Sequence, residues 1–322
     1  MTVSGTVLIL EPGYADYEVE RKTFAPLGVT VVPVPETADV SVAFAEHNPV
    51  GLMVREHQVT AAMMDQCPQL KGVVRYGVGV DNIDLSAAKD RGIKVANVPD
   101  YGAENEVSDH AVALYLAVAR RIVMRDHAVR TGAWGIGQRE RIAGHRRGVL
   151  GLIGYGRIAR QAHRKFQALG FETVLVYDPH VPDAAVSEAG AERVDLDTLF
   201  QRSDLVSLHV PYVPETRHIV DARRLSLMKP DAVLVNVSRG GLIDEDALAQ
   251  ALTDGALFGA GLDVFETEPP GPDHPLFSAP NTVVSDHTAW YSEQSVSILQ
   301  ENAAMELRRI LAGEDPKSWV NR

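Results

Sequence analysis

The chain has 322 residues, of which 45% are hydrophobic and 23% charged, a balance typical of globular proteins and enough length for two domains. Its 43 acidic residues outnumber its 31 lysines and arginines, and the formal net charge of -12 disfavours binding to nucleic-acid phosphates. The single cysteine, Cys67, has no Cys partner for a disulfide or a metal site, and no metal site is expected.

The N-terminal segment "MTVSGTVLILEPGYADYE" has a short apolar run, no basic region before it and acids soon after it. This pattern predicts a first β-strand and not a secretory signal. No apolar run approaches the ~18 residues that a membrane helix needs. We therefore expect a cytoplasmic protein that does not associate with membranes.

Short apolar runs alternate with amphipathic segments in the N-terminal part of the chain. Continuous apolar strands separated by helices are typical of a parallel α/β sheet. The predicted strands are residues 6–10, 29–34, 50–54, 72–76 and 93–98, with helices at 60–67 and 85–92.

A long helical stretch, residues 104–132, separates this series from a second one and is followed by a polar, basic loop at 138–148. The final segment, residues 292–313, is an amphipathic helix with Gly313 as its stop. Two successive series predict two doubly wound α/β domains, with a break near Pro99–Tyr101. The strands expected in the second series are 148–154, 173–178, 205–210, 232–238, 259–265 and 282–286.

A glycine turn follows the first strand of the second series, in "VLGLIGYGRIAR". Gly154, Gly156 and Ala159 fit the pattern G-x-G-x-x-[GA] between a strand and a helix, where backbone N–H groups can meet a pyrophosphate. A structural glycine turn would explain this pattern alone about as often. The next strand, however, ends at Asp178, whose carboxylate suits ribose hydroxyls and repels a 2′-phosphate, so NAD is favoured over NADP.

Three charged side chains follow other strands of the same series. Arg239 follows residues 232–238, Glu268 follows 259–265, and His287 follows 282–286. Ligands of doubly wound sheets bind outside the carboxyl ends of the strands, so we expect these side chains to converge near a bound cofactor. Each alone could be an ordinary solvated residue of a turn, and their joint placement is what indicates a site.

These residue types suit hydride transfer between a nicotinamide and a hydroxyl carbon. An imidazole can move a proton near neutral pH, and a neighbouring carboxylate favours the imidazole's charged form. An arginine can orient a 2-oxo acid and stabilise charge on its oxygen. His287, Glu268 and Arg239 are the candidates for these three roles.

The chain resembles the D-2-hydroxyacid dehydrogenases over nearly its full length. The matching segments are "RYGVGVDNIDL", "VLGLIGYGRIAR", "VYDP", "HVPYVPETRHIV", "LVNVSRGGLIDEDAL", "LDVFETEP" and "DHTAWYSEQS". The resemblance implies that Arg239 binds the substrate's carboxylate and carbonyl, and that Glu268 and His287 form the acid–base pair.

The same resemblance implies binding residues for cofactor and substrate. The expected NAD contacts are Gly154, Gly156, Arg157, Ile158, Asp178, Val210, Pro211, Thr216, Val237, Ser238, Asp263 and His287. The expected substrate contacts are Arg75, Tyr76, Gly77, Val78 and Gly79, a loop of the other domain whose backbone amides hold the carboxylate, together with Arg239 and Trp290.

The resemblance also implies the domain organisation. A flavodoxin-like substrate domain, residues 1–101 and 293–322, would carry an inserted Rossmann NAD-binding domain, residues 102–292. The long helix and the loop around Trp134 resemble the family's dimerisation arm, which implies a homodimer.

Within the family, "HTAWYSEQS" and "RYGVGVDNID" are most similar to the C-terminal-binding-protein branch. Two departures from the family pattern stand out. Asp286 replaces the usual proline before the histidine, and Ala159 replaces the third glycine. Glu268 stands where formate dehydrogenases carry glutamine, so formate is not expected as the substrate. Trp290, Tyr76 and Tyr291 suggest an apolar pocket tolerant of aromatic groups.

The sequence favours an NAD-dependent enzyme that reduces a 2-oxo acid to a D-2-hydroxy acid, a small-molecule function. One alternative is an NAD(H)-responsive interaction protein similar to the co-repressors of that branch, for which this chain lacks appended recognition segments. A second alternative is an enzyme on the same scaffold that oxidises an inorganic anion of the phosphite type.

Overall fold

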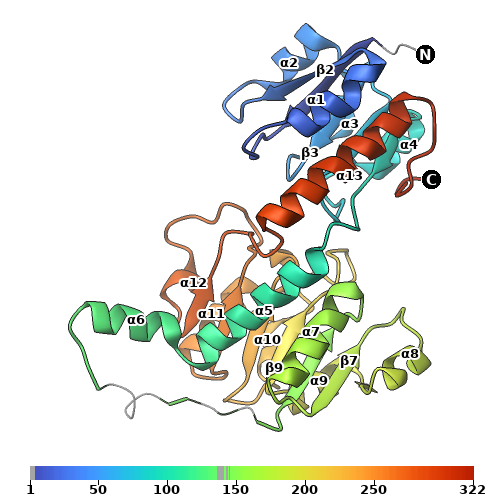
Figure 1. Ribbon diagram of the computed structural model, residues 1–322. Helices are drawn as coiled ribbons and strands as arrows, with labels where there is room; N and C mark the ends of the chain where they lie inside the picture. The colour runs from blue at the N-terminus through green and yellow to red at the C-terminus, as the bar shows by residue number, and fades with distance from the viewer. Residues whose placement is uncertain (1–3, 136–140, 143, 145) are drawn as a thin grey trace. The chain divides into compact units, whose positions relative to one another are not determined.

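The computed structural model describes residues 4–135, 141–142, 144 and 146–322 (Figure 1). Two compact units make up the chain: unit 1 is Met1–Gly102 with Ser292–Arg322, and unit 2 is Ala103–Tyr291. The chain therefore passes from one unit to the other twice, after Gly102 and after Tyr291. These passages lie one residue from the domain limits expected from the sequence.

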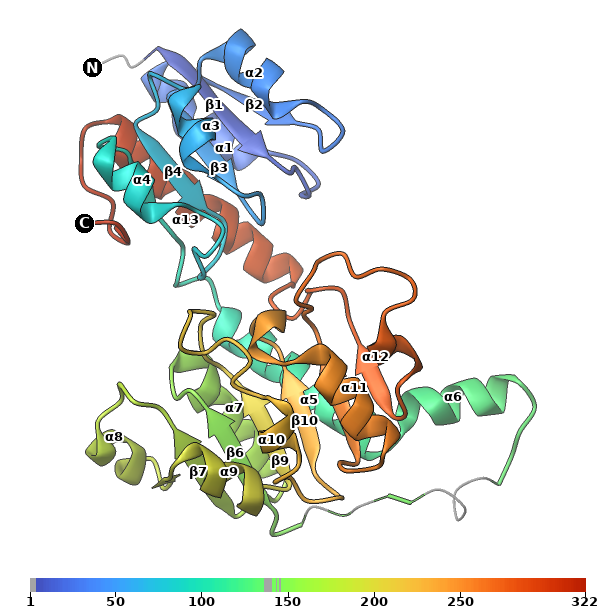
Figure 2. The same cartoon turned by 180° about the vertical axis from the view of Figure 1, so that it is seen from behind.

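Unit 1 is built on a five-stranded parallel sheet with the order β2-β1-β3-β4-β5, which is the flavodoxin-like order. Helices α1 and α13 cover one face of the sheet, and α2, α3 and α4 cover the other (Figures 1 and 2). The strands are β1 (Gly5–Leu10), β2 (Val29–Val34), β3 (Gly51–Val54), β4 (Gly72–Arg75) and β5 (Lys94–Ala96). The helices are α1 (Glu18–Phe24), η1 (Ala25–Leu27), α2 (Val40–His47), α3 (Ala61–Asp65), α4 (Leu85–Asp90) and α13 (Glu293–Leu311).

The last helix, α13, completes unit 1 although it comes from the far end of the chain. It begins with a capping box in which Ser292 and Ser295 each accept the other's backbone N–H, and Gly313 follows it with a φ of +85°. A Cβ added at Gly51 would lie 3.0 Å from Leu307, and one at Gly72 would lie 2.7 Å from Ile310. Glycine in β3 and β4 therefore allows α13 to lie directly on the sheet.

Unit 2 is a seven-stranded parallel sheet with the order β12-β11-β10-β9-β6-β7-β8, a Rossmann-type order that confirms the second predicted α/β sheet. Helices α5 and α7 cover one face (Figure 1), and α9, α10 and α11 cover the other (Figure 2). The strands are β6 (Val149–Ile153), β7 (Thr173–Tyr177), β8 (Glu192–Arg193), β9 (Leu205–Leu208), β10 (Val233–Asn236), β11 (Gly259–Leu262) and β12 (Thr282–Val284). The helices are α5 (Ala103–Ala119), α6 (Ile122–Arg130), α7 (Arg157–Ala168), α8 (Asp183–Glu188), α9 (Leu196–Arg202), α10 (Ala222–Leu225), η3 (Gly240–Leu242), α11 (Glu245–Thr253) and α12 (Pro275–Ser278).

Two features of unit 2 differ from the sequence prediction. The stretch 104–132 is not one helix, because Arg121 takes the left-handed conformation (φ +53°) and separates α5 from α6. The two-residue strand β8 was not predicted, because Glu192 and Arg193 have no apolar character. Residues 136–140, 143 and 145, which include parts of the predicted basic loop, lie outside the described residues.

Candidate active site

The three predicted catalytic side chains all follow neighbouring strands of unit 2. Arg239 follows β10, Glu268 follows β11 and His287 follows β12, and these strands are adjacent in the sheet. The strands are parallel, so their carboxyl ends share one edge and the three loops meet there.

His287 and Glu268 form a direct pair at this edge. The Nδ1 atom of His287 lies 2.6 Å from Oε2 of Glu268, while Oε1 of Glu268 accepts the backbone N–H of Phe265 at 2.9 Å. A carboxylate only accepts, so Nδ1 carries a proton toward Glu268 and Nε2 is the ring nitrogen left for chemistry. The two side chains are 20% and 32% exposed, which leaves the pair open to a small molecule.

The electrostatics of the pair keep Glu268 ionised. Partial burial acts to raise the pKa of Glu268, but the hydrogen bond and charge of His287, the Phe265 N–H and the charge of Arg239 together lower this pKa below its usual value. Glu268 is therefore held in its charged form, which accepts the Nδ1–H of His287.

The backbone around His287 is fixed by Asp263, which is 1% exposed. The carbonyl of Asp263 accepts the His287 N–H at 2.7 Å, and its carboxylate accepts the N–H groups of Thr288 at 3.0 Å and Ala289 at 2.9 Å. These bonds hold His287 at a φ of +56°, a conformation that non-glycine residues rarely adopt. Asp263, expected from the resemblance as an NAD contact, thus also organises the turn that carries the imidazole.

Trp290 and Asp286 complete the His287 turn. The indole Nε1 of Trp290 donates to the carbonyl of His287 at 2.9 Å, and Asp286, which replaces the usual proline, accepts the Thr288 hydroxyl at 3.2 Å. Both bonds stay within the turn, so the exposed Asp286 adds a local hydrogen bond where proline would have restricted the backbone.

The Arg239 loop lies directly against the loop that carries Glu268. A Cβ added at Gly240 would stand 1.8 Å from the carbonyl carbon of Phe265, so only glycine fits between the two backbones. Arg239 itself is anchored at both ends of the residue: its carbonyl accepts Nδ2 of Asn236, and its Nη1 donates to the carbonyl of Ser238, both at 2.8 Å. This packing fixes a guanidinium next to the Glu268–His287 pair.

The glycine turn after β6 has the shape expected of a pyrophosphate cradle. Gly154 has a φ of +91°, and a Cβ there would lie 2.5 Å from the carbonyl oxygen of His209. Gly156 is the N-cap of α7 with no side-chain cap, and a Cβ there would meet nothing within 4 Å. Ala159 is fully buried, as the small third position of the motif requires. These residues fit a dinucleotide, with Arg157 and Ile158 opening the helix at that point.

Asp178 stands at the end of β7 beside the cradle. Its carboxylate accepts the backbone N–H groups of Tyr155 at 2.8 Å, His180 at 2.8 Å and Val181 at 3.1 Å. This fixed negative group suits ribose hydroxyls. Arg193, which is not among the predicted site residues, donates to the carbonyls of Asp178 and Val181 and pairs with Asp183, so its charge is already engaged.

The remaining predicted cofactor contacts lie at the carboxyl ends of β9 and β10. The hydroxyl of Thr216 accepts the Val213 N–H at 2.9 Å and donates to the carbonyl of Pro211 at 2.7 Å, which folds the loop that contains Val210. Ser238 donates to the carbonyl of Leu208 at 2.9 Å and joins the two strand ends, and Val237 is buried behind them.

The predicted substrate loop, residues 75–79, belongs to unit 1. Arg75 donates through Nε to the carbonyl of Arg55 at 3.0 Å and through Nη2 to Glu56 at 2.5 Å. Gly77 has a φ of +139°, and a Cβ there would collide with the Arg75 guanidinium. The loop therefore starts with a positioned arginine, and Val78 and Gly79 follow with partial exposure.

Tyr76 differs from its prediction. Its side chain is 3% exposed, and its hydroxyl donates to Glu20 at 2.7 Å inside unit 1. The ring therefore belongs to the core and does not line an aromatic pocket, because the alternation of a strand end directs it away from the loop surface.

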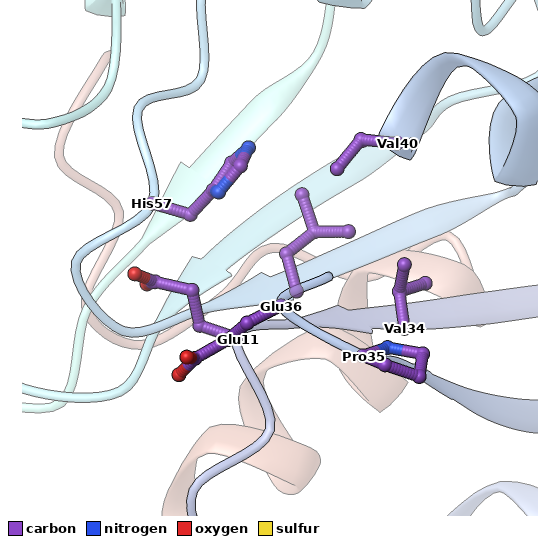
Figure 3. A pocket seen from close by; sticks show the side chains of 7 residues that line it. Glu11, Val34, Pro35, Glu36, Val40 and His57 are labelled. Atoms are coloured by element: carbon purple, nitrogen blue, oxygen red, sulfur yellow. The ribbon is translucent and has the colours of Figure 1, made fainter. Parts of the chain in front are cut away.

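A pocket of about 200 Å³ in unit 1 lies at the carboxyl ends of β1 and β2 (Figure 3). None of the predicted site residues lines this pocket. Its two carboxylates, Glu11 and Glu36, would repel an organic anion, so the pocket does not suit a 2-oxo acid. Its lining is Leu10, Glu11, Val34, Pro35, Glu36, Val40 and His57.

The described residues offer neither a metal site nor a membrane-spanning helix. Within those residues, no cluster of three or more His, Cys, Asp or Glu side chains could hold a metal ion. None of the helices that the structure describes is both long and apolar enough to cross a bilayer.

Comparison with known proteins gives a family and a fold. Residues 112–289 match the family described as "D-isomer specific 2-hydroxyacid dehydrogenase, NAD binding domain". Glyoxylate reductase of Thermococcus litoralis is 38% identical over 274 residues, 82% of this chain and 81% of that protein. D-3-phosphoglycerate dehydrogenase of Methanocaldococcus jannaschii is 38% identical over 267 residues, but this chain spans only about half (50%) of its length.

Solved structures with the same fold cover nearly the whole chain. The TT0316 protein from Thermus thermophilus has a TM-score of 0.85 with 33% identity, covering 98% of this chain and 99% of that one. D-lactate dehydrogenase from Aquifex aeolicus, solved with NAD and lactic acid, has a TM-score of 0.84 with 27% identity and covers 96% of each chain. The glycine cradle, Asp178 and the family match agree, and the chain belongs to the D-isomer specific 2-hydroxyacid dehydrogenase family and carries its NAD-binding domain.

Proposed function

We propose that this chain is an NAD-dependent oxidoreductase that reduces a 2-oxo acid to a D-2-hydroxy acid and catalyses the reverse reaction. The observation that carries the proposal is the 2.6 Å contact between Nδ1 of His287 and Glu268, placed beside Arg239 at the carboxyl edge of an NAD-binding sheet. The D configuration rests on membership of the family.

The proposed chemistry assigns one task to each side chain. His287, protonated on both ring nitrogens, donates the Nε2 proton to the carbonyl oxygen of the substrate and becomes neutral. Glu268 holds Nδ1 throughout and favours the charged imidazole before transfer. Arg239 orients the carboxylate and carbonyl and stabilises negative charge that develops on the oxygen.

The bound nicotinamide would supply the hydride that the carbonyl carbon accepts. One hydride on carbon and one proton on oxygen convert the C=O group to CH–OH, which balances the reaction. In the reverse direction neutral His287 accepts the hydroxyl proton. Arg75 and the backbone amides of residues 77–79 are proposed to bind the substrate's carboxylate.

A second arginine bears on the substrate class. Arg55 follows β3, its guanidinium lies against Gly13, where a Cβ would stand 2.6 Å from Nη1, and within the described chain no carboxylate pairs with it. The hydroxyl of Tyr14, which feels the charges of Arg55 and Arg75, is buried without a partner among those residues. An unpaired cation and an unsatisfied hydroxyl favour a substrate with a second anionic group, as in the relatives named D-3-phosphoglycerate dehydrogenase, over glyoxylate.

Three finer assignments are part of the proposal. The branch of C-terminal-binding proteins is supported by Trp290, whose indole is bonded to the His287 carbonyl. A homodimer is supported by α6, which has no buried residue, and by Ile122, Val123, Val129 and Trp134, which are 50% to 88% exposed. Analytical ultracentrifugation of wild type and Trp134→Glu tests the dimer. The cytoplasmic location stays a prediction.

The test of the function is oxidation of NADH in the presence of glyoxylate, pyruvate, hydroxypyruvate and 3-phosphohydroxypyruvate. We expect turnover with at least one acid, and a fall of about 10²- to 10⁴-fold in His287→Ala while NADH binding, followed by fluorescence, is retained. His127→Ala, an exposed histidine of α6, is the matched control and should leave turnover unchanged. NADH binding without turnover of any acid would instead favour the NAD(H)-responsive interaction protein.

A further inference from the structure

A side-chain network connects helix α5 with the turn that carries His287. Nε2 of His110, on α5, lies 2.8 Å from the hydroxyl oxygen of Ser285, and that hydroxyl lies 2.6 Å from Oδ1 of Asp263. The Asp263 carboxylate can only accept, so Ser285 donates to Asp263 and accepts from Nε2–H of His110. Nε2 also lies 3.4 Å from Oδ1 of Asp263, within reach of its charge.

At the end opposite His110, the network holds the turn that carries His287. Asp263 accepts the backbone N–H groups of three successive residues, His287 through its carbonyl and Thr288 and Ala289 through its carboxylate. At 1% exposure the carboxylate has no solvent to replace a lost donor, so its orientation depends on the protein groups that bond to it. Among the contacts described, the bond from His110 to Ser285 is the one that ties this network to a helix.

The network joins the first helix of unit 2 to the last segment of unit 2. Helix α5 starts at Ala103, the first residue of unit 2, and the His287 turn leads to Tyr291, its last residue. His110 and Ser285, which are 175 positions apart, therefore join the two segments through which the chain enters and leaves unit 2. A shift of α5 at this passage would pull on Ser285 and Asp263.

We propose that His110 is a positioning residue for the reaction. Through Ser285 and Asp263 it fixes the His287 turn against α5, so that the orientation of the acid–base imidazole follows the position of that helix. The inference rests on the proposed function of His287. A role in stability alone would lower the melting temperature without lowering kcat.

The kinetic test compares His110→Leu, which removes the donor, with His110→Gln, which can place an N–H donor near the position of Nε2. We expect His110→Leu to lower kcat about 10- to 100-fold, because a displacement of about 1 Å costs that much, with less than a twofold change in the Kd of NADH. His110→Gln should recover most of the loss. Ser285→Ala should match His110→Leu, and the double variant should be no worse than either alone.

Several outcomes would overturn the proposal. They are an unchanged kcat in His110→Leu, a loss in His110→Gln as large as in His110→Leu, or additive losses in the double variant. His127→Leu serves as the control for removing a histidine from a helix of unit 2.

A second readout separates failure of this proposal from failure of the proposed function. Amide hydrogen exchange at Thr288 and Ala289 needs no turnover, and we expect it to be at least tenfold faster in His110→Leu than in wild type. If the wild type reduces no 2-oxo acid but exchange accelerates, the function is wrong and the network stands. If turnover is present and exchange is unchanged, the positioning role is wrong.

Discussion

Each unit holds a carboxyl group with a shifted pKa, Glu268 in unit 2 and Glu20 in unit 1, and the two shifts have opposite signs. In unit 2, Glu268 meets an imidazole at 2.6 Å and the charge of Arg239, and despite partial burial its pKa is lowered. In unit 1, Glu20 is fully buried, and its side-chain partners among the described residues are neutral donors, the Tyr76 hydroxyl at 2.7 Å and the Gln300 amide at 3.2 Å. Burial raises the pKa of Glu20 more than these donors lower it. The comparison shows that a charged partner, and not burial, distinguishes the carboxyl group suited to acid–base chemistry.

The largest expected effect comes from removing the charge of Glu268. Glu268→Gln should lower kcat for 2-oxo acid reduction about 10²- to 10³-fold, because the charged imidazole loses the carboxylate that favours it. NADH binding should persist, because Glu268 is not part of the glycine cradle. Steady-state kinetics would measure kcat, and NADH fluorescence would measure binding.

The matched control for this variant is Glu266→Gln. Glu266 is two residues away and pairs with Arg217 and His218 instead of His287. Equal losses in the two variants would mean that the loop, and not the Glu268 charge, is responsible.

The next effect concerns stability in unit 1. Glu20→Ala should cost about 1–3 kcal/mol of the free energy of unfolding, since the Tyr76 hydroxyl and the Gln300 amide lose a buried acceptor. Denaturant unfolding of unit 1 would measure it, with Glu18→Ala on the exposed side of α1 as the control. A cost no larger than that of the control would contradict the assignment of Glu20 to the core.

Opposite pH dependences should follow from the opposite pKa shifts. The raised pKa of Glu20 stabilises the fold below the usual 4.5, and this contribution is lost as pH rises through the raised value. The lowered pKa of Glu268 stabilises the fold above 4.5, and this contribution is lost as pH falls through the lowered value.

The melting temperature of Glu20→Gln, measured relative to wild type, should therefore rise as the pH is raised from about 4 to 7. The melting temperature of Glu268→Gln relative to wild type should fall over the same range. Calorimetry of the three proteins across this range tests the signs. If the melting temperatures of both variants changed with pH in the same direction, the opposite pKa shifts assigned to Glu20 and Glu268 would be wrong.

The smallest effect is expected for Tyr76→Phe. The variant loses the hydroxyl that donates to Glu20, at a cost of about 1 kcal/mol, and keeps the buried ring. Its kcat should be unchanged. A fall in kcat would instead support the prediction from the sequence that the Tyr76 side chain lines the substrate pocket.

The sequence predicted the features that depend on local pattern. Apolar runs indicated both parallel sheets, and the rule that ligands bind at the carboxyl ends of strands indicated Arg239, Glu268 and His287. The short polar strand Glu192–Arg193 was missed because it carries no apolar signal. The break at Arg121 was missed because a left-handed arginine depends on tertiary contacts.

Contacts between distant segments were beyond the sequence. Nothing in the pattern around His110 indicates that it meets Ser285, and Ser285 was interpreted only as the end of a strand. Glu20 falls in a helix rich in charged residues, where only the packing of α13 shows that it is buried. A sequence-only signal for either residue would have required pairwise information about which positions vary together.

The order of synthesis sets the order in which the two units can close. Residues up to Gly102 leave the ribosome before unit 2 does. Gly51 and Gly72 are covered only when Leu307 and Ile310 of α13 have been synthesised. Unit 2 is continuous and can fold as soon as Tyr291 has emerged, since domains fold as units during translation. The residues up to Gly102 are therefore made before unit 2 but complete the burial of their sheet after it, and this sheet must stay free of aggregation until α13 has emerged.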